Sequence, residues 1–439
     1  MKPMRTRIFG ACALVALGCV FTALPLRAAS DTGSAVRRIV VAVADRPDPV
    51  ARAGSTPRGY GGLPDYTGSS RARTLATAVA EQHQLHEVSA WTIDALRLRC
   101  MLYELPAGIE RDVAIDALRR DPRVRLAQPL NEFETLGASL PTAADAFATA
   151  RNASYNDPYV GLQRGFDAID AASAQRWAQG EGVEIAIIDT ALDASHPDLR
   201  ERVVEQRDLA GTAPPANVND RHGTEVAGVI AAVANNELGI VGVAPAARLH
   251  AYRACWTVEA SGKARCDSYT LALALGAAID AGADIINLSL GGPSDLLLTE
   301  LTTHALDRGM RVVGAVPPDG RMDGFPVDIP GVIAVRAIGD APAPSAIAAP
   351  GRDILTLEPG GHYDFASGSS LAAAHVSGAL ALLLELRPRL DHAELLTLLR
   401  DAQPGPEAPF DVCRAVTAVR HDAACRASPH APLASSASP

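Results

Sequence analysis

Residues 368–378 read Gly-Ser-Ser-Leu-Ala-Ala-Ala-His-Val-Ser-Gly, a glycine pair that brackets an apolar segment. The pattern predicts a tight turn that leads into a buried helix from Ser370 to about Arg387, ended by Pro388. A backbone N–H in the first turn of a helix has no partner inside the helix and lies at the positive end of the helix dipole. Ser370 is therefore a candidate nucleophile whose own N–H would stabilise an oxyanion. The alternative is that it merely caps a core helix.

Upstream of this helix, short apolar strands alternate with helices. The predicted strands cover residues 183–188, 248–253, 285–288, 311–316 and 332–336, and the predicted helices cover 223–235, 269–281 and 297–309. This alternation predicts an α/β domain with a doubly wound parallel sheet. In such a sheet, catalytic groups collect at the carboxyl ends of the strands.

Two further residues lie where this rule places catalytic groups. Asp189 ends the strand 183–188, and His222 opens the next helix. Together with Ser370 they supply the orienting carboxylate, the base and the nucleophile of acyl transfer. The alternative is that Asp189 only caps a loop and that His222 is a helix N-terminal residue facing solvent. Among the other histidines, we interpret His375 as a packed structural residue.

At this point the chain resembles the subtilisin-like serine peptidases, in the chain order Asp, His, Ser, from about residue 156 to residue 399. The resemblance rests on motifs at Asp189-Thr190-Ala191, His196-Pro197-Asp198-Leu199, His222 to Gly228, Asn287 to Gly292, Ala349-Pro350-Gly351 and Gly368 to Gly378. It implies an endopeptidase acting on proteins or peptides. It also implies that Ser289, Leu290 and Gly291 pair with an extended substrate, with Cys266 to Tyr269 near the opposite edge of the cleft.

The resemblance to the thermitase-like branch implies a structural calcium ion. Hard oxygen ligands suit this ion. The implied ligands are the side chains of Asp157, Asp198 and Asn236 and the carbonyls of Val233, Leu238 and Ile240. The alternative is a polar surface turn without metal.

One departure from the family pattern affects the chemistry. The family supplies a second oxyanion donor from an asparagine, and this chain has Pro318 at that position, with no asparagine after Asn287. Proline offers no donor. Loss of one such donor costs about 10²- to 10³-fold in turnover. Asp319 is a poor replacement, because an ionised carboxylate repels an oxyanion.

The segments outside the peptidase domain complete the predicted organisation. Residues 1–29 have basic residues, an apolar run and small residues, typical of a signal peptide. Residues 35–135 predict a ferredoxin-like α+β unit of order βαββαβ, which the resemblance identifies as an inhibitory prodomain. Residues 136–155 predict a linker with a maturation cut, 156–426 the peptidase domain and 427–439 a disordered tail.

Composition and cysteines agree with an exported enzyme. The net charge of −10 over 439 residues argues against a nucleic-acid partner, and no second apolar run follows the first to suggest stable membrane insertion. Cys255 with Cys266, and Cys413 with Cys425, each close a loop of about a dozen residues and are candidate disulfides. Cys100 is left over.

The sequence therefore predicts an endopeptidase, secreted or periplasmic, made with its own intramolecular inhibitor. The alternative is a non-catalytic or self-processing-only relative that serves as a binding or scaffold protein.

Overall fold

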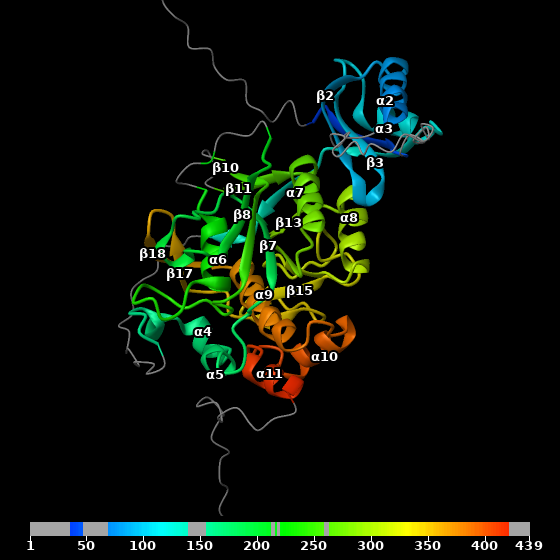
Figure 1. Cartoon of the computed structure of the whole chain (residues 1–439). Coiled ribbons are helices and arrows are strands. Elements are labelled where there is room, and N and C mark those ends of the chain that lie inside the picture. The colour runs from blue at the N-terminus through cyan, green and yellow to red at the C-terminus, as the bar shows by residue number, and fades with distance from the viewer. Residues whose placement is uncertain are drawn as a thin grey trace, which may run out of the picture.

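The computed structural model describes residues 36–46, 69–138, 155–211, 216, 220–258 and 263–420. The predicted signal peptide, most of the predicted linker, the tail and Cys425 lie outside these residues. The described chain forms a large α/β body and a smaller N-terminal unit beside it (Figure 1).

A seven-stranded sheet lies at the centre of the α/β body. Its order is β16 (Ile347–Ala349), β15 (Ile333–Ala337), β14 (Arg311–Ala315), β12 (Ile285–Leu288), β7 (Glu184–Asp189), β9 (Arg248–Arg253) and β8 (Val203–Asp208). Every neighbouring pair is parallel. The strand order reverses between β7 and β12, and the carboxyl ends there form the crevice in which such sheets bind ligands. The predicted doubly wound sheet is confirmed.

Helices cover both faces because the strands are apolar on both sides. One face packs against α6 (His222–Ala231) and α9 (Ser369–Leu386), and the other against α7 (Ser268–Ala281) and α8 (Leu296–Asp307). The remaining helices on the α9 side are α4 (Arg164–Ala168), α5 (Ala171–Ala174), α10 (His392–Asp401) and α11 (Val412–Arg420). Among the described residues, α9 alone has the length and apolarity of a membrane span, and 89% of it is buried inside the protein.

The predicted helix 223–235 is too long. The helix α6 ends at Ala231, because the next residues leave its axis: Val233 donates its N–H to the carbonyl of Asp198 at 2.8 Å, and Asn235 has a φ of 59°. These residues begin the loop that holds the predicted calcium ligands.

Several short elements were not expected from the sequence. They are the 3₁₀ turns η1 (Asp94–Leu96), η2 (Val160–Leu162) and η3 (Pro197–Leu199), the edge strands β8 and β16, the strands β10 (Cys255–Val258) and β11 (Lys263–Asp267), the hairpin β17 (Ile354–Glu358) with β18 (His362–Gly368), and the helices α4, α5 and α11. Most are too short to carry a hydrophobic period of their own. The strand β13 (Leu290–Gly291) lies in the segment that the resemblance pairs with an extended substrate.

The N-terminal unit has the predicted βαββαβ order. Its elements are β1 (Arg38–Ala44), α2 (Ser70–Gln82), β2 (His86–Ile93), β3 (Leu98–Glu104), α3 (Arg111–Arg119) and β4 (Val124–Pro129), and its antiparallel sheet has the order β2-β3-β1-β4. One face of this sheet packs on its own helices and the other on α7 and α8. Cys100 is a buried free thiol in β3.

Two strands follow the unit and enter the α/β body. The strand β5 (Glu132–Thr135) pairs with β11 and β13, and β6 (Gly137–Ala138) pairs with β18. The first part of the predicted linker is therefore an extended strand at the carboxyl edge of the main sheet.

Candidate active site

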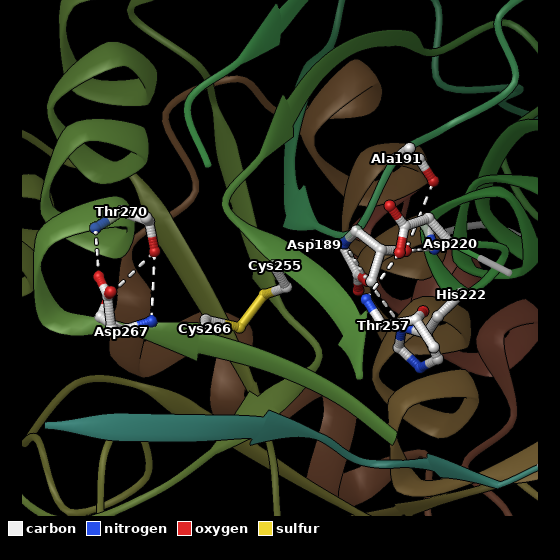
Figure 2. Close-up of a disulfide and its surroundings, with 11 residues drawn as sticks. Asp189, Ala191, Asp220, His222, Cys255, Thr257, Cys266, Asp267 and Thr270 are labelled. Atoms are coloured by element: carbon white, nitrogen blue, oxygen red, sulfur yellow. Dashed lines mark hydrogen bonds and ion pairs between the residues drawn. A yellow bond between two sulfur atoms is a disulfide. The ribbon is translucent and has the colours of Figure 1, made fainter. Parts of the chain in front are cut away.

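Asp189 and His222 form a buried pair at the end of β7 (Figure 2). Nδ1 of His222 lies 2.7 Å from Oδ1 of Asp189, and the N–H of Thr190 donates to the same oxygen at 2.6 Å. The helix α6 can start this close because residue 223 is glycine: a Cβ there would lie 2.8 Å from the carbonyls of Thr190 and Ala191. This geometry fixes the ring with Nδ1–H toward the carboxylate and Nε2 free to accept a proton.

Two opposing effects set the pKa of His222. Burial disfavours the imidazolium and lowers the pKa, while the charge and hydrogen bond of Asp189 raise it, and the net result is a raised pKa. Its Nε2 is buried without a hydrogen-bond partner among the described residues. The imidazole is therefore a base whose accepting nitrogen is available.

Ser370 is the second residue of α9, directly after a backbone turn at Gly368. Gly368 has a φ of 154°, and a side chain there would collide with the carbonyl of Leu136. Both the N–H and the Oγ of Ser370 donate to this carbonyl, at 3.4 and 3.1 Å. The N–H at the start of α9 thus contacts a peptide oxygen as an oxyanion donor would.

The extended segment 132–138 crosses the site between two edges. On one edge, Leu290 and Gly291 of β13 pair with Thr135 and Glu134. The carbonyl of Ser289, just before β13, accepts the N–H of Leu136 at 3.1 Å. The structure thus places Ser289, Leu290 and Gly291 along an extended segment of the chain itself, and their role toward a substrate stays a prediction.

The opposite edge is β11, whose residues Arg265 to Asp267 pair with β5. This edge lies slightly upstream of the expected Cys266 to Tyr269, because Ser268 and Tyr269 already belong to α7. A disulfide between Cys255 and Cys266 ties β11 to β10, as predicted (Figure 2). Cys413, of the other candidate pair, lies in α11.

The loop after β14 borders the same site. Pro317 lines a cavity of about 710 Å³ beside Leu136 and Gly291. Pro318 follows it, and its carbonyl accepts the N–H of Ala341 at 3.0 Å. The carboxylate of Asp319 is paired with Arg321 at 2.9 Å. Asp319 is therefore engaged with a cation rather than offered to the Leu136 carbonyl.

The other histidines near the site have structural contacts. His375 is buried in α9 and its Nδ1 lies 2.8 Å from the Leu371 carbonyl; burial lowers its pKa to about 4. Nε2 of His196 lies 3.1 Å from the His362 carbonyl, and its Nδ1 accepts the N–H of Asp198. Neither occupies the position of a general base.

The predicted calcium ligands gather around the loop after α6. Asp157 accepts the N–H groups of Asn235 and Asn236 at 2.8 and 3.4 Å. Asp198 accepts the Asn236 amide at 2.7 Å and the N–H of Ile240 at 3.1 Å. The amide oxygen of Asn236 accepts the N–H of Leu238 at 2.9 Å, and the carbonyl of Val233 belongs to the same loop.

The chemistry of this cluster fits a hard cation. Both carboxylates are buried, and within the described ranges neither has an ion pair with Lys, Arg or His. Burial, together with the charge of Asp198, raises the pKa of Asp157 despite its N–H donors. No group of three or more His, Cys, Asp or Glu side chains suited to a metal is found in the described part of the chain, so any ion here would also need amide and carbonyl oxygens.

Sequence reasoning missed three residues of the site: Phe133, Leu136 and Gly137. Their only signal is the short alternation Glu-Phe-Glu at residues 132–134, which is typical of a strand but ends at Thr135. It was obscured because the stretch lies at the boundary between the predicted N-terminal unit and the linker. Only the fold reveals that this strand enters the catalytic crevice.

A doubly wound sheet with an Asp–His pair and a serine at a helix N-terminus on its carboxyl edge defines the class of α/β serine hydrolases. The model of the subtilase family matches residues 180–412. The chain belongs to this family, whose members are serine endopeptidases.

Individual relatives agree with this family assignment. An intracellular serine protease of Paenibacillus polymyxa is 37% identical over 51% of this chain and 73% of its own length. A thermophilic serine proteinase of Bacillus sp. (strain AK1) is 31% identical over 68% of this chain and 73% of its own. The crystal structure of fervidolysin from Fervidobacterium pennivorans matches with a TM-score of 0.68 at 21% identity. The match covers 87% of this chain and 60% of the fervidolysin chain, and it supports the fold.

Proposed function

We propose that this protein is an exported serine endopeptidase in which Asp189, His222 and Ser370 are the orienting carboxylate, the base and the nucleophile. The observation that carries the proposal is the extended peptide strand at Ser370, whose Leu136 carbonyl accepts both the N–H and the Oγ of that serine. Asp189 holds the His222 tautomer and stabilises the imidazolium that forms when the serine gives up its proton.

Substrate binding in this proposal is strand addition. The edges Ser289–Gly291 and Arg265–Asp267 bind the substrate backbone from both sides, as they bind β5. Main-chain hydrogen bonds of this kind can form with any extended peptide, so side-chain pockets must supply the selectivity. Proteins or peptides with an exposed extended segment are the expected substrates.

The oxyanion hole is incomplete in our proposal. The N–H of Ser370 supplies one donor, and Pro318 supplies none at the family's asparagine position. We expect turnover to be reduced by about 10²- to 10³-fold relative to a site with both donors. The triad and the strand contacts still allow slow hydrolysis.

The N-terminal unit acts as an intramolecular inhibitor in this proposal. Its sheet packs on α7 and α8, and the strand that follows it fills the substrate groove. A substrate cannot enter until this segment is cut and leaves. The signal peptide over residues 1–29 would direct the precursor out of the cytoplasm.

A calcium ion is proposed at Asp157, Asp198 and Asn236 with the carbonyls of Val233, Leu238 and Ile240. Two buried carboxylates that have no cationic partner among the described residues support it. Bound there, calcium would supply structural stabilisation away from the triad and no step of the reaction.

The test is the intact mass of the exported protein, wild type beside Ser370→Ala. We expect only the wild type to lose its N-terminal unit. If both proteins keep the unit, or both lose it equally, Ser370 is not a working nucleophile. The alternative of a non-catalytic scaffold, favoured by Pro318, would then replace the protease.

A further inference from the structure

The extended segment 132–138 runs through the catalytic site as an uncut substrate would. On the N-terminal side of the point where the segment passes Ser370, β5 pairs with β11 on one side and with β13 on the other. On the C-terminal side of that point, Gly137 and Ala138 pair with Gly368 and Ser367 of β18. The chain therefore has main-chain partners on both sides of one position, and that position faces Ser370.

The carbonyl at this position belongs to Leu136. It accepts the N–H of Ser370 at 3.4 Å and its Oγ at 3.1 Å, while the N–H of Leu136 donates to the carbonyl of Ser289. The N–H and the carbonyl oxygen of Leu136 are therefore both held by hydrogen bonds. The bond that follows the carbonyl, between Leu136 and Gly137, is the one presented to the nucleophile.

The residue after this bond has no room for a side chain. A Cβ on Gly137 would lie 2.5 Å from Nε2 of His222 and 3.3 Å from Oγ of Ser370. The first distance is below any real Cβ contact, and His222 cannot yield because Asp189 fixes its ring at 2.7 Å. Glycine at this position therefore lets the peptide chain lie against both Nε2 of His222 and Oγ of Ser370.

Two side chains before the bond contact separate parts of the groove. Leu136 lies against Gly291 at the cavity that Pro317 also lines; a Cβ on Gly291 would lie 3.3 Å from its Cδ1. Phe133 is 1% exposed and packs edge-to-face on Phe325, with ring centroids 5.5 Å apart. It also lies over Gly292, where a side chain would collide with its ring.

We propose that Leu136–Gly137 is the first bond this enzyme cuts and that the same contacts define its substrates. These are extended peptides with an aromatic residue at the position of Phe133, leucine at the position of Leu136 and glycine directly after the cut. The inference rests on the proposed function of Ser370.

The step is an acyl transfer. Oγ of Ser370 bonds to the carbonyl carbon of Leu136 and its proton passes to Nε2 of His222. That proton then goes to the nitrogen of Gly137 as the C–N bond breaks, and the new amine leaves. Water, deprotonated by the same imidazole, releases the Leu136 carboxylate and restores Ser370.

The experiment uses the full-length precursor and mass spectrometry of both products. Wild type should give one product that begins at Gly137 and a fragment that ends at Leu136. Gly137→Ala should slow this cut at least about tenfold, since a buried Cβ collision of this kind is worth that much or more. The matched control is Gly276→Ala in α7, where a Cβ meets no atom within 4 Å, and it should process like wild type.

A peptide pair tests the selectivity without any folding question. The processed enzyme is given Asn-Glu-Phe-Glu-Thr-Leu-Gly-Ala-Ser-Leu, which copies residues 131–140, and the same peptide with alanine for the glycine. We expect kcat/KM to fall at least about tenfold for the second peptide. Equal rates, or Ser370-dependent cuts at another bond, overturn the inference and leave the proposed function intact. Processing of Ser370→Ala at the wild-type rate overturns the proposed function itself.

Discussion

In the proposed mechanism, Pro318 is the residue that most directly limits catalysis. The loop that contains it borders the cavity beside Leu136 through Pro317, and the family resemblance implies that the second oxyanion donor belongs at position 318. Pro318→Asn would add the missing amide donor. We expect kcat to rise by up to about 10²-fold with little change in KM, since the new hydrogen bond forms mainly in the transition state. Steady-state kinetics on the Leu-Gly peptide measure both.

Asp319→Asn is the control for this prediction. It introduces the same amide one residue later, where the native side chain pairs with Arg321 rather than with the substrate carbonyl. Its kcat should stay at the wild-type level. If Pro318→Asn also leaves kcat unchanged, the site does not lack an oxyanion donor at position 318.

A second residue-scale feature is the carboxyl pair of Glu225 and Glu358 near His222. Arg221 contacts both, at 3.1 Å and 3.0 Å. Burial, followed by the charge of Glu225, raises the pKa of Glu358 to about 7, while Arg221 opposes the shift. The folded protein therefore keeps a proton that the unfolded chain releases at about pH 4.5.

The pH dependence of stability follows from this shift. Between about pH 4.5 and 7 the folded state binds more protons than the unfolded state, so the stabilisation by this group is complete below that window and is lost as pH rises through it. In a Ser370→Ala background, we expect the parent to lose stability relative to the Glu358→Gln variant as the pH rises from 5 to 7.5. The free energy of unfolding of the variant minus that of the parent should therefore increase over this range. Urea titrations at both pH values measure it. A constant difference between the two proteins would show that Glu358 titrates normally.

At the scale of elements, β4 contributes a side chain to the start of α8. Oε1 of Gln128 accepts the N–H of Leu297 at 3.0 Å, and its Nε2 donates to Asp295 at 2.7 Å. Asp295 is itself the N-cap of α8. Because these groups are buried, removing the amide leaves a helix N–H and a carboxylate oxygen with fewer partners.

Gln128→Ala should therefore weaken the hold of the N-terminal unit on the enzyme. We expect the isolated product that ends at Leu136, added back to processed enzyme, to inhibit about 10- to 100-fold less well with this change. Arg125→Ala, on the exposed side of the same strand, is the control and should inhibit like wild type. An unchanged inhibition constant for Gln128→Ala would mean that the unit is held by its apolar face alone.

The elements also show what the sequence can and cannot predict. Strands such as β7 and β12 and helices such as α9 are mostly apolar, and their lengths and order sufficed to predict the sheet. The polar edge strand β8 and the two-residue β13 have no such signal and are formed by their neighbours. Asp189, His222 and Ser370 were predictable because each stands at an element boundary. Gly137 was not, because only the register of β6 on β18 brings it to His222.

At the scale of the whole molecule, the loop after α6 joins distant parts of the α/β body. It holds Asp157 at the start of that body and Asp198 in η3. It also contacts the β17–β18 hairpin, where Tyr363 packs edge-to-face on Tyr159 at 5.2 Å and lies against Gly239. Because β18 leads directly into Ser370, an ion bound at this junction would stabilise the active-site end of α9.

Calcium should therefore raise the thermal stability of the whole body. In a Ser370→Ala background, which prevents self-digestion, we expect saturating calcium to raise Tm by about 5 to 10 °C over a chelator, the effect of a ligand at about 100 times its Kd. Asp157→Asn should abolish most of this response, since the ion loses a buried carboxylate that no cation in the described part of the chain balances. Asp307→Asn, at the exposed end of α8, should keep it. A Tm that is the same in calcium and in chelator would mean that the N–H donors of the loop are sufficient partners for both carboxylates, and that no ion completes the junction.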